Sequence, residues 1–375
     1  MAGADIHPPL QFVLRWAWAH LGGLGVLWQK SFSVLAALGS MGLAFARARR
    51  GFGARAALVT LALLTVNAAA LQYSQEIEEY SLEWVLVGLM VLAGWRWIEA
   101  RRTRDAALYV AAAALGFINH YETLVVAAIL ALCGTLALSR EPRALRGWLL
   151  LHLAAFALFL PFLPTMHQQW IRENHGHFFR FPSPSQIAGV WRAMGFASRF
   201  ALAPMLALSL VPLFRVETRR FAAFVWPLVL LAPFATRFWV VVLPREALFV
   251  LPLWLMLVAG GLERIPWRVA RALVIAGLLA LGVRSLRPLP RYREAVVTRL
   301  AERALAPRLA RGALLVHGES HSLLFFEQYH PEYRNRLLTQ PAERVEFFEG
   351  GLAIPESLYM TYGAWRKERE SGTPW

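Results

Sequence analysis

The sequence predicts an all-α polytopic membrane protein with a small α/β appendage at its C-terminal end. Of the 375 residues, 57% are hydrophobic, and they include 15 tryptophans and 23 phenylalanines, more than an ordinary soluble domain contains. The apolar residues fall in repeated runs of roughly 14 to 18, long enough to cross a bilayer core when flanking residues help. Short arginine-rich clusters separate the runs, so we expect membrane-spanning helices.

About ten apolar runs are candidate spans, and a short amphipathic segment precedes them. Residues 10–21 carry Trp16 and Trp18 beside Arg15, which predicts a helix that lies in the outer membrane interface. The candidate spans are residues 31–47, 56–72, 82–98, 107–119, 123–138, 148–165, 197–214, 221–236, 247–262 and 272–285.

Every second connection between these spans is rich in arginine. The clusters lie within residues 47–55, 101–104, 140–146, 215–220 and 264–271. The positive-inside rule places them in the cytoplasm, so the other connections face outside, among them the long loop 166–196. This predicts a multi-pass protein of the plasma (inner) membrane with an extracytoplasmic active side and C-terminus. The net charge of +15 then reflects topology and membrane lipids, and we expect no nucleic-acid partner.

The composition changes at about residue 286, where long apolar runs end. We therefore expect a transmembrane domain over residues 1–285 and a small extracytoplasmic region over 286–375. Within the tail the pattern predicts strands at 313–318 and 344–350, and a helix at 320–329.

The stretch LQYSQEIEEYSLEW, residues 71–84, holds four glutamates and neither lysine nor arginine. If this stretch is helical, Glu76, Glu79, Tyr80 and Glu83 share one face and Glu78 points elsewhere. Such a face could line a polar cavity, or it could be solvated at the membrane surface. Both interpretations stay open at this point.

Basic residues on the outer side are candidates for binding a phosphate. Arg245 is the best of them because the sequence LPRE introduces a span at its outer end, and Arg237 and Lys30 are further candidates. Each could instead extend to the lipid headgroups. His120, in NHYE, lies at a tight outer bend and is a candidate cavity residue.

The sequence assigns no metal site and no certain cofactor. His175 and His177 form only a His-x-His pair, which offers too few ligands, although a divalent metal stays possible. A phosphate-binding loop of the Walker type is also missing, which argues against a nucleotide-driven pump.

Four motifs carry a resemblance to a known family: ADIHPPL (4–10), YSQEIEEYSL (73–82), NHYE (119–122) and LPREALFVLP (243–252). Over about residues 4–285 the sequence resembles bacterial relatives of the dolichyl-phosphate-mannose–protein mannosyltransferases and the lipid A aminoarabinose transferases. These are membrane glycosyltransferases of the GT-C fold. The resemblance implies inverting transfer of a hexosyl or pentosyl unit from a polyprenyl-phosphate sugar donor to a lipid, glycan or protein acceptor.

The resemblance also implies roles for particular residues. Asp5 and His7 would sit at the mouth of the cavity, and Asp5 and Glu76 are the candidate catalytic residues. Arg245 would contact the donor phosphate, and Lys30 would assist it.

This sequence departs from the family in two ways. The family has a first span and an outer acidic residue upstream of HPPL, so we expect the natural chain to begin before Met1. Glu78 and Glu79 stand where relatives carry arginine and methionine, and Glu246 replaces a tyrosine. A catalytically silent scaffold or lipid-binding protein is therefore the main alternative, and a transporter is the less favoured one.

Overall fold

The computed structural model describes residues 8–23, 25–173, 183–235 and 244–287, together with the short segments 314–317, 334–339 and 359–361. The chain divides into two compact units, Ile6–Arg287 and a second one formed by Met1–Asp5 with Pro288–Trp375. In the described part of the first unit every regular element is helical.

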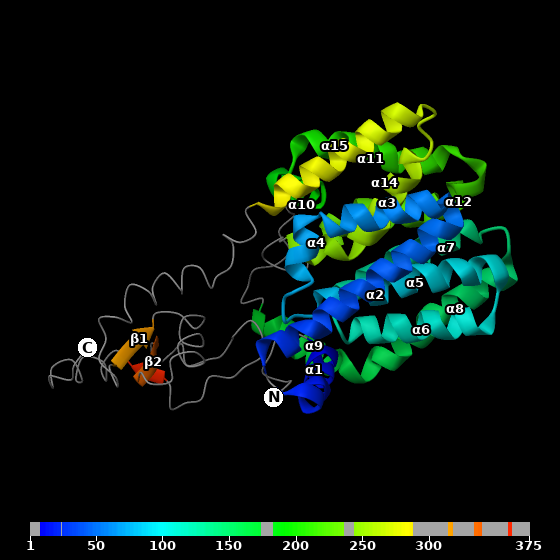
Figure 1. Cartoon of the computed structure of the whole chain (residues 1–375). Helices are drawn as coiled ribbons and strands as arrows, with labels where there is room; N and C mark the ends of the chain where they lie inside the picture. Colours follow the sequence, from blue (N-terminus) through cyan, green and yellow to red (C-terminus); the bar gives the residue numbers. More distant parts are fainter. Residues whose placement is uncertain are drawn as a thin grey trace. The chain divides into compact units, whose positions relative to one another are not determined.

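The first unit is a bundle of helices (Figure 1). The α-helices are α1 (Pro9–Gly22), α2 (Val26–Phe52), α3 (Ala54–Thr65), α4 (Ala68–Tyr73), α5 (Tyr80–Ala100), α6 (Thr103–Phe117), α7 (Glu122–Ala137), α8 (Pro142–Phe159), α9 (Leu163–Glu173), α10 (Pro184–Met194), α11 (Arg199–Leu210), α12 (Val216–Ala235), α13 (Pro244–Ala247), α14 (Leu251–Leu262) and α15 (Arg268–Leu286). Short 3₁₀ turns are η1 (Leu160–Phe162), η2 (Val211–Phe214) and η4 (Leu248–Val250).

Each predicted span overlaps one of these helices or a short series of them. Within the described residues, four helical segments are long and apolar enough to cross a membrane: Leu27–Phe52, Tyr80–Ala100, Pro142–Gln169 and Arg268–Leu286. Four shorter apolar helices lie at Ala54–Thr65, Glu122–Ala137, Phe200–Phe214 and Leu248–Leu262. A multi-helix membrane protein is thus supported, and the number of spans stays a prediction.

The amphipathic helix predicted at 10–21 is confirmed as α1. Pro9 begins it with the φ angle that a first helical turn needs, and Gly23 ends it at a φ of 88°, which favours glycine. The helix folds back on the start of α2, where the rings of Trp18 and Trp28 stack with centroids 4.7 Å apart. Each indole N–H also donates to the other residue's carbonyl oxygen, at 2.9 and 2.7 Å.

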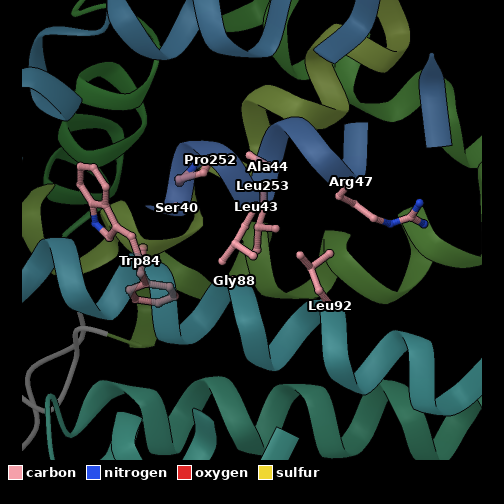
Figure 2. Close-up of a pocket in the computed structure, with 10 residues that line it drawn as sticks. Ser40, Leu43, Ala44, Arg47, Trp84, Gly88, Leu92, Pro252 and Leu253 are labelled. Carbon is pink, nitrogen blue, oxygen red and sulfur yellow. The ribbon is translucent and has the colours of Figure 1, made fainter. Parts of the chain in front are cut away.

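Helix α5 runs between α2 and α6 and contacts both (Figure 1). The α2–α5 contact is close because small residues lie in it: a Cβ on Gly88 would come within 3.3 Å of Leu43. A narrow apolar cleft remains between α2, α5 and α14, with Trp84 near one end and Arg47 near the other (Figure 2). Its open volume of about 10 Å³ has room for roughly one water molecule, so this contact is well packed.

The five arginine-rich connections lie at one end of the bundle, as their alternation along the sequence predicts. The contacts that join them are Arg55–Glu263 (3.4 Å), Arg271–Glu263 (3.6 Å), Arg101–Glu141 (2.8 Å), the Arg47 guanidinium over the Phe221 ring (3.7 Å) and the Trp95–Phe221 ring pair (5.6 Å). Helices α1 and α4 lie at the opposite end (Figure 1). The bundle therefore has one strongly basic end, and its cytoplasmic placement stays a prediction.

The region 166–196, predicted as an outer loop, is partly helical. Helix α9 continues to Glu173, and α10 occupies Pro184–Met194. The reason is a tertiary contact: the hydroxyl of Tyr121 donates to the side-chain oxygen of the buried Gln169, which holds α9 against the α6–α7 turn. Burial raises the pKa of Tyr121, so it stays a hydrogen-bond donor. His175 and His177 lie outside the described residues.

The second unit contains a parallel three-stranded sheet in the order β1-β2-β3. The strands are β1 (Leu314–His317), β2 (Arg334–Thr339) and β3 (Tyr359–Thr361). Leu314 pairs with Arg334, and Leu337 pairs with Tyr359. The strand predicted at 313–318 is confirmed as β1, whereas β2 and β3 were not predicted. The expected helix at 320–329 and strand at 344–350 lie outside the described residues.

The α11–α14 contact depends on a glycine, which gives a first prediction. A Cβ on Gly261 would overlap the backbone carbonyl oxygen of Leu208, so Gly261→Ala must push α11 away. We expect a loss of about 1–3 kcal/mol in the free energy of unfolding, the usual cost of overpacking. Thermal unfolding of the detergent-solubilised protein measures it. The matched control is Gly42→Ala on α2, which has nothing within 4 Å and should leave stability equal or slightly raised. Equal stability of the two variants would contradict this packing.

Candidate functional site

Four segments meet at the end of the bundle opposite the arginine-rich connections. They are the start of α1, the turn 74–79, the α6–α7 turn 118–121 with the first residue of α7, and α13. The backbone N–H of Leu10 donates to the carbonyl of Ile118 at 2.9 Å, and the Asn119 side-chain amide donates to the carbonyl of Glu79 at 3.3 Å. Arg245 of α13 lies 3.8 Å from the Glu78 carboxylate. These are the segments that carry the four sequence motifs.

The glutamate stretch is not one helix, contrary to the arrangement considered from the sequence. Residues 74–79 form a turn, and helix α5 begins only at Tyr80. The carbonyl of Glu76 accepts a hydrogen bond from the Ser33 hydroxyl of α2, and the carbonyl of Glu78 accepts one from the Arg15 guanidinium at 3.3 Å. Side chains from outside thus satisfy backbone groups that a helix would have paired internally. Glu79, Tyr80 and Glu83 still lie on one side, around His120, whereas the Glu76 side chain bonds to Gln72 instead.

Arg15 links α1, α2 and the glutamate turn, and sequence reasoning did not find this role. Its guanidinium donates to the Ser33 hydroxyl, to the Gln29 carbonyl and to the Glu78 carbonyl. Burial lowers its pKa to about 10, while the carboxylates of Glu79 and Glu78 favour its charged form, so it remains a cation at neutral pH. The only signal in the sequence was its place between the aromatic residues of α1.

Three buried carboxylates surround His120. Exposed fractions are 3% for Glu79, 0% for Glu83, 1% for Glu122 and 4% for His120. The imidazole Nδ1 lies 3.7 Å from a Glu83 oxygen and 3.8 Å from a Glu122 oxygen, and Nε2 lies 3.6 Å from a Glu79 oxygen. Glu122 is the last residue of the NHYE motif, and the sequence does not single it out as a site residue. Buried carboxylates this close repel one another unless a proton or a cation lies between them.

Arg245 forms a second, more accessible group with Glu78 and Tyr80. Its guanidinium contacts the Glu78 carboxylate at 3.8 Å, and its Cζ lies 5.5 Å from the centre of the Tyr80 ring. The Arg245 and Glu78 side chains are 20% and 26% exposed, so solvent reaches both. The structure therefore places one predicted phosphate-binding residue beside two predicted cavity residues.

The other predicted site residues have separate positions. Glu76 is half-buried and accepts a hydrogen bond from the Gln72 amide at 3.3 Å. Lys30 is half-buried on α2, one turn before Ser33. Asp5, His7 and Arg237 lie outside the described residues.

A family comparison agrees with this geometry. Residues 6–166 match the family model described as dolichyl-phosphate-mannose-protein mannosyltransferase. The matched range contains the start of α1, the glutamate turn and the α6–α7 turn, whereas α13 lies beyond it. Among curated proteins none matches the sequence.

Solved structures share the fold over most of the chain. ArnT from Cupriavidus metallidurans bound to undecaprenyl phosphate matches with a TM-score of 0.64 and 16% identity, covering 96% of this chain and 80% of that chain. The apo state of the same protein matches with a TM-score of 0.57 and 16% identity, covering 98% and 78%.

A more distant match is the oligosaccharyltransferase AglB from Archaeoglobus fulgidus, in complex with an inhibitory peptide and a dolichol-phosphate. Its TM-score is 0.50 at 14% identity, covering 76% of this chain and 47% of that chain. At such identities the likeness shows the fold. The chain is therefore a GT-C-fold membrane protein that resembles the dolichyl-phosphate-mannose–protein mannosyltransferases and the aminoarabinose transferases.

Proposed function

We propose that this protein transfers a sugar from a polyprenyl-phosphate-linked donor to an acceptor on the outer face of the plasma membrane. The observation that carries the proposal is the contact of Arg245 with Glu78, in the turn that also carries Glu76, at the end of the bundle opposite the basic connections. The mannosyltransferase family match supports the reaction class. The fold shared with a protein bound to undecaprenyl phosphate supports the donor class.

Arg245 would bind the donor phosphate. Its planar guanidinium suits phosphate oxygens, and it stabilises the charge that builds up on the phosphate as the sugar leaves. In the structure Glu78 lies 3.8 Å away, so an incoming phosphate would exchange with this carboxylate. Lys30, Arg237, His7 and Asp5 remain predictions for the rest of the donor site.

Glu76 is the carboxylate that we assign as catalytic base. It is half-exposed, whereas Glu79 and Glu83 are buried around His120. A base must come within hydrogen-bond reach of the acceptor hydroxyl. The hydroxyl proton would pass to Glu76 as the acceptor oxygen bonds to the sugar carbon and the polyprenyl phosphate leaves with its electron pair, inverting that carbon.

The two ends of the bundle support our proposal that the site faces outside. If the arginine-rich end is cytoplasmic, the glutamate turn faces outward. Helix α1 leaves Val13, Trp16 and Leu21 exposed, as expected for a helix in the outer interface. The C-terminal region would then be extracytoplasmic, and the acceptor would be a lipid, glycan or protein.

A silent, lipid-binding member of the fold is the second candidate function. The sequence contains two aspartates, Asp5 and Asp105. Asp105 lies 3.2 Å from Arg96 near the basic end and cannot serve the site. Within residues 1–375 the base would therefore be a glutamate or Asp5, and lipid binding without transfer would favour this candidate.

Replacing Arg245 tests the donor-phosphate assignment. Arg245→Gln should weaken binding of undecaprenyl phosphate about tenfold or more, because a charge-assisted hydrogen bond contributes roughly 1.5–3 kcal/mol. Microscale thermophoresis on the protein in nanodiscs measures the dissociation constant. Arg192→Gln, an exposed arginine of α10, is the matched control and should bind like wild type. Undecaprenol, which lacks the phosphate, should show no difference between the variants. Equal weakening by both variants would remove Arg245 from the donor site.

Replacing Glu76 tests the base. Glu76→Gln should reduce release of undecaprenyl phosphate from polyprenyl-phosphate sugars by about 100-fold, the usual lower range for loss of a general base, while lipid binding stays unchanged. Released lipid is quantified by chromatography over a panel of donors and acceptors, since it is formed whichever sugar is used. Glu217→Gln at the basic end is the control. Full turnover in Glu76→Gln would exclude this base, and wild-type binding without turnover on the whole panel would favour the silent member.

A further inference from the structure

We infer that Glu83, His120 and Glu122 bind a divalent cation of the zinc type between the start of α5 and the α6–α7 turn. The three residues come from two segments, and their exposed fractions are 0%, 4% and 1%. Each offers one ligand atom, and the three atoms lie within 4.8 Å of one another. This site is distinct from the Arg245 group and does not depend on the class of donor.

The distances suit an ion between the residues better than direct hydrogen bonds. The His120 Nδ1 lies 3.7 Å from Glu83 and 3.8 Å from Glu122. Hydrogen bonds between nitrogen and oxygen fall at about 2.7–3.2 Å. A zinc ion that holds its ligands at about 2.1 Å would separate them by roughly 3.4 Å in tetrahedral geometry. A small inward movement of the side chains therefore completes the site.

A third carboxylate of the same cluster lies on the other side of the imidazole. Nε2 lies 3.6 Å from a Glu79 oxygen, opposite the two ligand carboxylates. Histidines that bind zinc through one nitrogen commonly donate the other N–H to a carboxylate, which fixes the tautomer and the ring orientation. The Glu79 backbone is itself held by the Asn119 amide at 3.3 Å. The Nε2–Glu79 distance is an ion-pair distance, longer than a hydrogen bond, so Glu79 would orient His120 only if it moves toward the ring when the ion binds.

Charge and ligand type indicate the kind of ion. Glu83, Glu122 and His120 are all buried, so a bound divalent cation would lie out of solvent between two carboxylates and one imidazole. One imidazole and two carboxylates match zinc, whereas magnesium and calcium prefer oxygen ligands alone. Three protein ligands leave a fourth position for water. The bound ion would join α5 to the α6–α7 turn.

Zinc uptake by the full chain tests the site. The protein in nanodiscs is stripped with a chelator, exposed to Zn²⁺ alone and separated from unbound metal before elemental analysis. Wild type should retain one ion per chain, and His120→Asn and Glu83→Gln should fall to background. His152→Gln is the matched control, because this histidine bonds to Tyr109 away from the site, and it should retain the ion.

Two further readouts keep the test decisive if a variant folds poorly. X-ray absorption of wild type should show a nitrogen and oxygen shell at about 2.0–2.1 Å around zinc and no sulfur. Zinc should raise the unfolding temperature of wild type and not that of His120→Asn, because an ion that binds only the folded state stabilises it. A wild type that takes up no zinc, or uptake that survives His120→Asn and is lost in a His175→Ala/His177→Ala variant, would overturn the assignment. Loss of undecaprenyl phosphate binding would count against the proposed function and would not affect the zinc assignment.

Discussion

The hydrogen bonds from Arg15 and Ser33 to the backbone of the glutamate turn are the interactions on which the site depends. They satisfy the carbonyl groups of Glu76 and Glu78 with side chains from α1 and α2. The chain can therefore stop being helical after α4 without leaving these groups unpaired, and α5 starts afresh at Tyr80. This break separates Glu76 from the side on which Glu79 and Glu83 meet His120, whereas one continuous helix would place all three on the same face.

The break divides the acidic residues into two groups with different environments. Glu79 and Glu83 are buried with His120 and join the start of α5 to the α6–α7 turn. Glu78, beside Arg245, is partly exposed. A charged side chain at membrane depth is costly unless it is paired or has a function. The buried group around His120 therefore suits a fixed link between helices, and the exposed Glu78–Arg245 pair suits exchange with a ligand.

The two ends of the bundle differ in charge: the arginine-rich connections lie at one end and the glutamate turn lies at the other. Close contacts through small residues, such as Gly88 against Leu43, hold α2 and α5 parallel along their length. Their arginine-rich ends therefore meet the same neighbours, and their opposite ends present the glutamate turn beside α1 and α13. The cleft between α2, α5 and α14 is nearly filled, which keeps these three helices in close contact.

Hydropathy and charge along the sequence determined the helices, their alternating basic connections and the order of the four motifs, because each of these is a local property. Tertiary structure decided which acidic residue faces which partner. Arg15 and Glu78 are 63 positions apart, and Asn119 and Glu79 are 40 apart. No local pattern encodes such pairings, so the role of Arg15 and the recruitment of Glu122 became visible only in the fold. The physical reason is that the energy of a buried charge depends on its neighbours in space.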